Sequence, residues 1–75
     1  MELRFSAHAL LRMGLREIGQ EQVRAVLARP QWTPSTHRNT RYDGMVGGRR
    51  LAVIVAEEHQ PPVVVTLWWY DERRE

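Results

Sequence analysis

The spacing of apolar residues changes once along this 75-residue chain, and the change limits the folds it can adopt. From Ser6 to Ala28 apolar residues recur at intervals of three and four, which indicates two amphipathic helices. From Thr40 onward they alternate or run continuously, which indicates strands. We expect three strands, over residues 40–46, 49–57 and 62–70. The sequence therefore predicts one α+β domain over residues 1–75, with two N-terminal helices packed on a three-stranded antiparallel β-meander.

Local signals place the ends of these elements. Ser6 is a good N-cap for the first helix, and Gly19 can cap the second. The first helix has one apolar stripe, expected to pack on the sheet and made of Ala7, Leu10, Leu11, Leu15 and Ile18. Met13 points away from that stripe and suggests a second contact. Gly47-Gly48 suits a two-residue hairpin turn, but Asp43-Gly44 is a rival, so the register of the first strand stays open.

The last two strands are apolar on both faces, as "LAVIVA" and "VVVTLWWY" show. Two short helices can cover only one face of such a sheet. The other face must be covered by loop and tail, by a second subunit or by a ligand, so a homodimer is one of the open alternatives.

Composition excludes several classes of protein. The chain has no cysteine, and its three histidines lie far apart in sequence, so we expect no metal and no cofactor. No apolar run reaches the roughly 18 residues that a membrane span needs. The N-terminus lacks the pattern of a signal peptide. We therefore expect a soluble, cytoplasmic protein without a membrane partner.

Arginine is concentrated in the middle of the chain. Between Gln22 and Ala56 the sequence has six arginines and a single acid, Asp43. This asymmetry favours an anionic partner. A GC-rich genome, which favours arginine over lysine, or a charged sheet edge that resists pairing would produce the same pattern.

His8 and Arg12 lie one turn apart near the start of the first helix. The N-terminus of a helix attracts anions and tends to keep an imidazole neutral. Arg12 can hold a phosphate with two hydrogen bonds. The pair is thus a candidate catalytic site facing the groove between helix and sheet, although a surface histidine and an ion-paired arginine fit the same spacing.

The first hairpin supplies candidate RNA contacts. Tyr42 lies among the arginines of the hairpin, and arginine interleaved with an aromatic residue is typical of surfaces that stack on bases and hold phosphates. The candidates are Arg38, Tyr42, Arg49 and Arg50, with Arg41 assigned to catalysis. An exposed hairpin tip carries arginines at no cost, which is the alternative explanation.

The stretch "HALLRMGLREIGQEQVRAVLARP" resembles the start of the family called domain of unknown function 4258. Members share His-Ala-x-x-Arg-Met, a turn, and a second helix that ends near a proline; Glu17 and Gly19 depart from the usual turn. The strands that follow look like that family's meander. The resemblance implies kinship with small RelE- and BrnT-like toxins, which share the α-α-β-β-β order.

What the resemblance implies is a metal-independent endoribonuclease that attacks phosphorus with a ribose 2′-hydroxyl. His8 would be the general acid or base, and Arg12 and Arg41 would stabilise the phosphoryl charge. The partners would be RNA, ribosome-associated RNA included, and a cognate antitoxin or other protein. The alternative is a non-catalytic protein- or RNA-binding module that dimerises through its apolar sheet.

Overall fold

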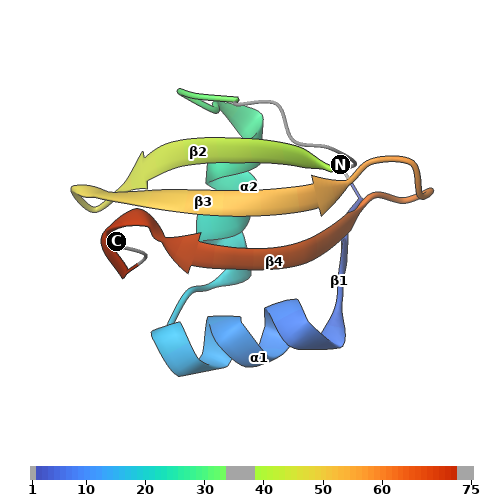
Figure 1. Ribbon diagram of the computed structural model, residues 1–75, viewed down its shortest axis with the longest axis horizontal. Helices are drawn as coiled ribbons and strands as arrows, with labels where there is room; N and C mark the ends of the chain where they lie inside the picture. Colours follow the sequence, from blue (N-terminus) through green and yellow to red (C-terminus); the bar gives the residue numbers. More distant parts are fainter. Residues whose placement is uncertain (1, 34–38, 73–75) are drawn as a thin grey trace.

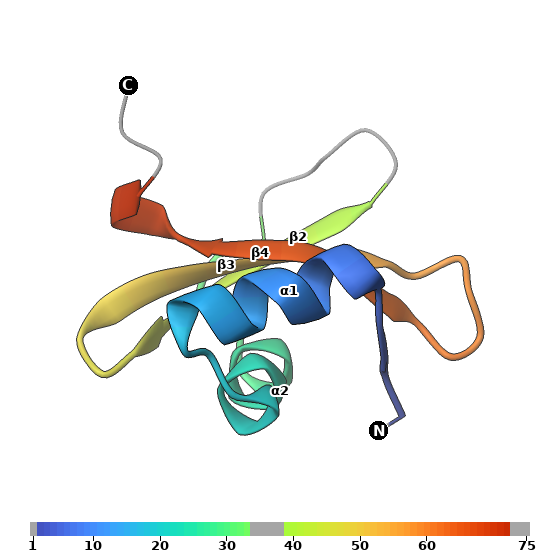
Figure 2. The same cartoon turned by 90° about the horizontal axis from the view of Figure 1, so that it is seen from below.

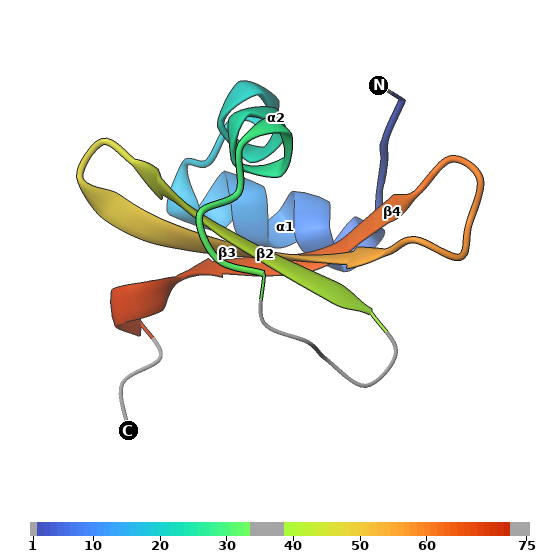
Figure 3. The same ribbon diagram turned by 90° about the horizontal axis from the view of Figure 1, so that it is seen from above.

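The computed structural model describes residues 2–33 and 39–72 (Figure 1). Its elements, in chain order, are β1 (Arg4–Phe5), α1 (Ala7–Arg16), α2 (Gln20–Ala28), β2 (Thr40–Val46), β3 (Arg49–Ala56), β4 (Val63–Trp69) and the 3-10 turn η1 (Tyr70–Glu72). The strands form one sheet in the order β1-β4-β3-β2. Both helices lie on the same face of this sheet, so the fold has two layers (Figures 2 and 3).

The predicted three-stranded antiparallel meander is wrong, because the sheet has four strands and is mixed. β2, β3 and β4 are antiparallel neighbours, but β1 pairs with β4 in parallel. Arg4 lies opposite Val63, and Phe5 opposite Val64. A strand of two residues has no measurable alternation, and its pairing partner lies far away in sequence. Neither local propensity nor periodicity could therefore indicate it.

The first hairpin turns at Gly47-Gly48, as one of the two predicted alternatives had it. Both glycines have positive φ, 57° and 84°, and the flanking pair is Val46 opposite Arg49. Asp43 and Gly44 lie inside β2, paired with β3. The open question of register is thereby answered, and Asp43 belongs to a strand.

Both helices begin where the sequence predicted. The Ser6 hydroxyl accepts a hydrogen bond from the backbone N–H of Ala9 at 3.0 Å. The second helix is capped differently, because the N–H of Gly19 donates to Gln22 Oε1 at 2.9 Å. These contacts satisfy N–H groups that have no partner within the helix.

The core lies between the helices and the sheet. Its members are apolar residues from both layers: Ala9, Met13, Ile18, Val23, Val26, Leu51, Val53, Val55, Val64, Leu67 and Trp69. The two layers approach each other closely at Gly44, where an added Cβ would lie 3.3 Å from Val26 Cγ2. A glycine in β2 therefore allows α2 to pack directly on the backbone of the sheet.

The orientation of α1 differs from the prediction. Of its predicted core stripe, only Ile18, just beyond the helix, is buried; the four stripe residues within α1 are exposed: Ala7, Leu10, Leu11 and Leu15. Ala9 and Met13 face the core instead. The helix is thus turned about its axis, with most of its leucine side toward solvent.

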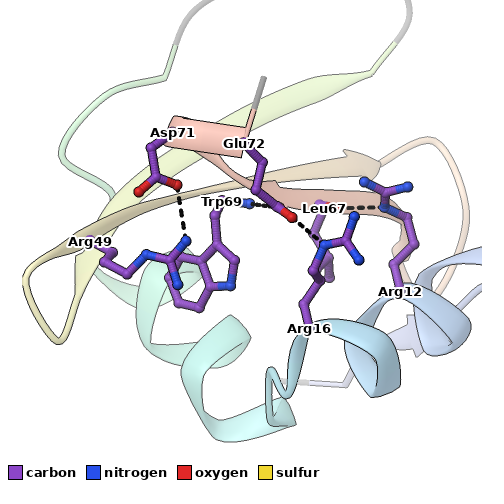
Figure 4. A network of polar contacts seen from close by, with 7 residues as sticks. All are labelled: Arg12, Arg16, Arg49, Leu67, Trp69, Asp71 and Glu72. Carbon is purple, nitrogen blue, oxygen red and sulfur yellow. Dashed lines mark hydrogen bonds and ion pairs between the residues drawn. The ribbon is translucent and has the colours of Figure 1, made fainter. Parts of the chain in front are cut away.

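Polar contacts to the edge of β4 explain this orientation. The Ser6 hydroxyl donates to the carbonyl of Val65 at 2.8 Å, and Arg12 Nε donates to the carbonyl of Leu67 at 3.2 Å. Arg16 forms an ion pair with Glu72, whose Oε1 accepts the N–H of Trp69 (Figure 4). An edge strand buried without such partners would lose backbone hydrogen bonds. Facing the arginine side of α1 toward β4 avoids that loss.

Candidate nucleic-acid interface

The sheet face opposite the helices carries a cluster of charged side chains centred on Asp43. Successive residues of a strand point to opposite faces. Because Leu51 and Val53 lie in the core, Ala52 and its cross-strand neighbours Asp43 and Trp68 lie on the other face. We call this surface the arginine face and define it by Trp32, Arg41, Asp43, Arg50, Trp68 and Tyr70.

Asp43 is the centre of the arginine face and is fully buried. Arg41 binds it with two hydrogen bonds, from Nε to Oδ1 at 2.8 Å and from Nη2 to Oδ2 at 2.9 Å. Arg50 Nε donates to Oδ2 at 2.7 Å. One carboxylate thus holds two guanidiniums, and the cluster keeps one positive charge in excess. The hydrogen bond to Asp43 raises the pKa of Arg41, although burial opposes the shift.

The backbone of Asp43 is also paired. Its N–H donates to the carbonyl of Trp32 at 2.8 Å, and its carbonyl accepts from Gln31 and Trp32 at 2.8 and 3.2 Å. This isolated bridge brings the loop after α2 against the edge of β2. The loop therefore places the Trp32 ring on the arginine face.

Aromatic rings flank both arginines. The Arg50 guanidinium lies 4.2 Å from the centroid of the Trp32 ring and 4.4 Å from that of Tyr70. Arg41 lies 5.5 Å from the Trp68 ring. Cation–π contacts at these distances are favourable and hold the guanidinium planes in place. Trp32 and Tyr70 remain 42% and 50% exposed, so parts of both rings are accessible to a ligand.

The arginine face covers part of the second side of the sheet. Ala52 of β3 is fully buried although both helices lie on the other face. Trp32, from the loop after α2, and Tyr70, from η1, both lie against Arg50 on this side. Loop and tail thus supply part of the cover, while a second subunit or a ligand over the rest of this face stays a prediction.

The structure does not bring the predicted catalytic residues together. His8 is exposed near the start of α1, and Arg12 reaches from α1 to the edge of β4 (Figure 4). Arg41 lies on the arginine face, across the sheet from α1. The cleft expected between the His8–Arg12 pair and the hairpin arginines is therefore absent from the described residues.

The predicted RNA contacts are likewise divided. Arg50 belongs to the arginine face, but Arg49 points to the side of the helices, where it lies 4.3 Å from the Trp69 ring centroid and 3.0 Å from Asp71 Oδ1 (Figure 4). Arg38 lies outside the described residues. Tyr42, also a predicted contact, is on the helix side.

Tyr42 lines a small pocket rather than the arginine face. Its hydroxyl donates to a carboxylate oxygen of Glu57, and this hydrogen bond, with burial, raises the pKa of Tyr42 to about 12. The pocket has a volume of about 210 Å³, and its apolar lining includes Leu3, Leu27 and Val55. At neutral pH the phenol stays protonated and bound to Glu57, so it is not a free acid or base.

Sequence reasoning missed the residue that organises the site. Asp43 was visible as the single acid among the arginines of residues 22–56, and that isolation was the available signal. Trp32 could not be assigned, because its place depends on a bridge to a strand formed later in the chain. The neighbouring residues Trp68 and Trp69 lie on opposite faces of β4: Trp69 is in the core, and the Trp68 ring lies near the Arg41 guanidinium.

Fold and site together define a small two-layer α+β protein with a cationic, aromatic sheet face. A family model, "Domain of unknown function (DUF4258)", matches residues 5–69, and the chain belongs to this family. Comparisons with curated proteins and with solved structures found no match.

Within residues 2–33 and 39–72, neither helix has the length and apolar character to span a membrane. In the same ranges no three acidic, histidine or cysteine side chains gather as a metal site would require.

Proposed function

We propose that this protein binds single-stranded RNA through the arginine face. One observation carries the proposal: two guanidiniums, held by one buried carboxylate, lie among partly exposed aromatic rings. The excess positive charge supports binding of a phosphate, because a guanidinium donates hydrogen bonds in a fixed planar array. The Nη groups of Arg50 take no part in its bond to Asp43 and remain suited to this role.

The aromatic rings support binding of bases. Bases in single strands stack on exposed tryptophan and tyrosine, and each such contact contributes about 1–3 kcal/mol. The rings of Trp32 and Tyr70 both lie within 4.4 Å of the same guanidinium, an arrangement that suits a phosphate between two bases. Double-stranded RNA does not present its bases in this way, since they are stacked inside the helix. RNA as the ligand agrees with the cytoplasmic location expected from the sequence.

Fluorescence anisotropy with a labelled oligouridylate of about ten nucleotides tests the proposal. Trp32→Ala should weaken binding about 5- to 150-fold, matching the loss of about 1–3 kcal/mol from one stacked base. Arg50→Gln should lower the slope of log affinity against log salt by about 0.7, the value of one phosphate contact in a single strand. Circular dichroism checks that both variants fold.

Arg49→Gln is the matched control, because it removes the same charge from the neighbouring residue but from the other side of the sheet. It should leave the salt slope unchanged. Equal effects of Arg49→Gln and Arg50→Gln, together with an unaffected Trp32→Ala, would mean that net charge alone attracts the RNA and that the arginine face is not the site.

Cleavage of the bound RNA is a second candidate, favoured by Tyr70, whose ring lies 4.4 Å from the Arg50 guanidinium. In this reaction the 2′-hydroxyl gives up its proton to water as its oxygen attacks the adjacent phosphorus, the bond from phosphorus to the 5′-oxygen breaks, and the leaving oxygen takes up a proton. Arg41 and Arg50 would stabilise the charge on the phosphoryl oxygens. Tyr70 would supply the proton, a role typically worth about 10²–10⁴-fold.

Cleavage of labelled RNA in the presence of EDTA separates the possible mechanisms. Loss of activity in Tyr70→Phe but not in His8→Ala would place the reaction on the arginine face. The reverse result would support the mechanism predicted from the sequence, with His8 as acid or base. Intact RNA with the wild-type protein, at concentrations where it binds, would leave binding as the function.

A further inference from the structure

The solvent side of α1 is apolar along its whole length. Leu10, Leu11 and Leu15 are 49%, 61% and 64% exposed, and Ala7 and Gly14 lie between them on the exposed side of the helix. At 100° per residue these five positions fall on one continuous arc, which we call the leucine arc. A Cβ added at Gly14 would meet nothing within 4 Å. Another chain could therefore approach the helix backbone closely at this point.

A leucine arc on the outside of a helix needs an explanation. A helix of a small domain normally packs its apolar stripe on the core. Here Ala9 and Met13 face the core instead, and α1 is held in this orientation by hydrogen bonds from Ser6 and Arg12 to β4 and by the ion pair of Arg16 with Glu72 of η1. Three neighbouring leucines, each about half exposed or more, form the kind of patch that marks an interaction site rather than a scattered surface residue.

Basic residues follow only one of the two borders of the leucine arc. His8 and Arg12 follow one border of the arc at a spacing of four residues, beside the row of Ala7, Leu11 and Leu15. In Figure 4 the Arg12 side chain reaches from α1 to the edge of β4, where its Nε is bonded to the carbonyl of Leu67; among the described residues, the structure gives no hydrogen bond of its Nη groups. A partner segment that covers the leucines would thus meet basic groups along one of its own edges.

A second copy of this chain fits the arc poorly. If two α1 helices packed antiparallel about a two-fold axis, the border with His8 and Arg12 would lie along the same border of the other copy, and like charges would face each other. The helix is also only about 15 Å long. A stable dimer buries about 800 Å² on each partner, which one face of such a helix does not supply.

A membrane surface fits less well than a protein. An interfacial helix normally has basic residues on both borders of its apolar face. The second border of the arc runs past Leu10 toward Glu17, which is exposed and acidic. A protein segment with carboxylates on one edge matches this asymmetry.

We propose that the leucine arc is the docking surface for an acidic amphipathic helix of a partner protein. The partner's apolar side chains would pack beside Leu10, Leu11 and Leu15, with Gly14 allowing close approach of the two helices. Its carboxylates, along one edge, would lie beside His8 and Arg12. This surface lies across the sheet from the arginine face, so the inference does not depend on RNA binding.

Two designed helical peptides of about twenty residues, long enough to be helical when bound, test the inference. Both carry leucines at positions i, i+3, i+4 and i+7. One has glutamates along the border of that stripe, and the other has lysines at the same positions. Fluorescence anisotropy with labelled peptide measures the affinity of the full chain. The glutamate peptide should bind at least about tenfold more tightly than the lysine peptide, equivalent to roughly 1.4 kcal/mol.

Substitutions in the chain locate the binding. The double variant Leu11→Ser, Leu15→Ser should weaken binding of the glutamate peptide at least about tenfold. Ala25→Ser, on the exposed side of α2, is the control and should have no effect. Because all three positions are exposed, the variants should keep the circular dichroism spectrum of the wild type.

Several results would overturn the proposal. One is equal affinity for the two peptides, and another is no binding of the glutamate peptide. A third is a homodimer in sedimentation experiments that Leu11→Ser dissociates, which would make a second copy the occupant. A fourth is leucine-dependent binding to vesicles of phosphatidylcholine and phosphatidylserine with no binding to the peptide, which would make the arc a membrane contact.

Discussion

At the scale of single residues, Asp43 shows how a strand can carry a charge in a fully buried position. A buried carboxylate without partners costs several kcal/mol, so such a residue persists only when it is paired and hydrogen-bonded. Here three hydrogen bonds from two arginines surround the carboxylate, and the rings of Trp32 and Trp68 lie over those arginines. The same contacts fix the two guanidiniums that we propose bind RNA.

Asp43→Asn should therefore destabilise the protein strongly. The amide keeps the size of the side chain but leaves two neighbouring cations without their counter-charge. We expect a loss of about 3 kcal/mol in the free energy of unfolding. Urea denaturation followed by tryptophan fluorescence measures it. Asp71→Asn is the control, because that carboxylate pairs with Arg49 but its side chain is 63% exposed, and its loss should cost at most about 1 kcal/mol.

At the scale of elements, α1 was expected to pack through its leucines and instead packs through Ala9 and Met13. The periodicity correctly indicated a helix, but it did not determine which side would face the sheet. That choice depends on the carbonyl groups of Val65 and Leu67, which receive hydrogen bonds from Ser6 and Arg12. Satisfying these backbone groups takes precedence over burying three leucines.

Two substitutions in α1 measure this preference directly. Leu15→Ser should change the free energy of unfolding by less than about 0.5 kcal/mol, because the side chain is 64% exposed. Met13→Ala should cost about 2–5 kcal/mol, as for other buried large side chains. Chemical denaturation of both variants provides the comparison. The opposite ranking would mean that α1 packs as the sequence alone suggested.

The difference between local sequence patterns and pairing of distant segments explains what else the sequence could and could not predict. Both helices, their caps and the three longer strands follow from local patterns, and the structure has them within one or two residues of the prediction. The strand β1 and the bridge at Trp32 do not, because each pairs with a distant segment and has no local pattern of its own. The candidate site was incomplete for the same reason. Arg41 and Arg50 stood out in the sequence, and so did Asp43 as the single acid among them, but its pairing with both arginines depends on the register of β2 and β3.

At the scale of the whole molecule, the spacing of the two layers depends on Gly44. Val26 Cγ2 and Cγ1 would lie 3.3 and 3.4 Å from a Cβ at this position, and even its Cα would lie at 3.6 Å. Helix α2 thus packs on the sheet where β2 has no side chain. A small domain has few other contacts to compensate if this approach is prevented.

Gly44→Ala should push α2 away from β2 and cost about 1–3 kcal/mol. Gly14→Ala adds the same methyl group to the exposed side of α1, where nothing lies within 4 Å, and should instead stabilise the protein by about 0.5–1 kcal/mol. Thermal unfolding of the two variants should therefore shift the midpoint in opposite directions. A similar shift for both would show that layer spacing is not set at Gly44.

The pairing of the first and last thirds of the chain has a consequence for biosynthesis. Ser6 and Val65 are bonded across 59 residues, and both β1 and the inner side of α1 rest on β4. The ribosome adds about 5–20 residues per second, so several seconds pass between synthesis of the N-terminal helix and synthesis of β4, the strand on which it packs. The native layers can assemble only after β4 has been made and has left the exit tunnel.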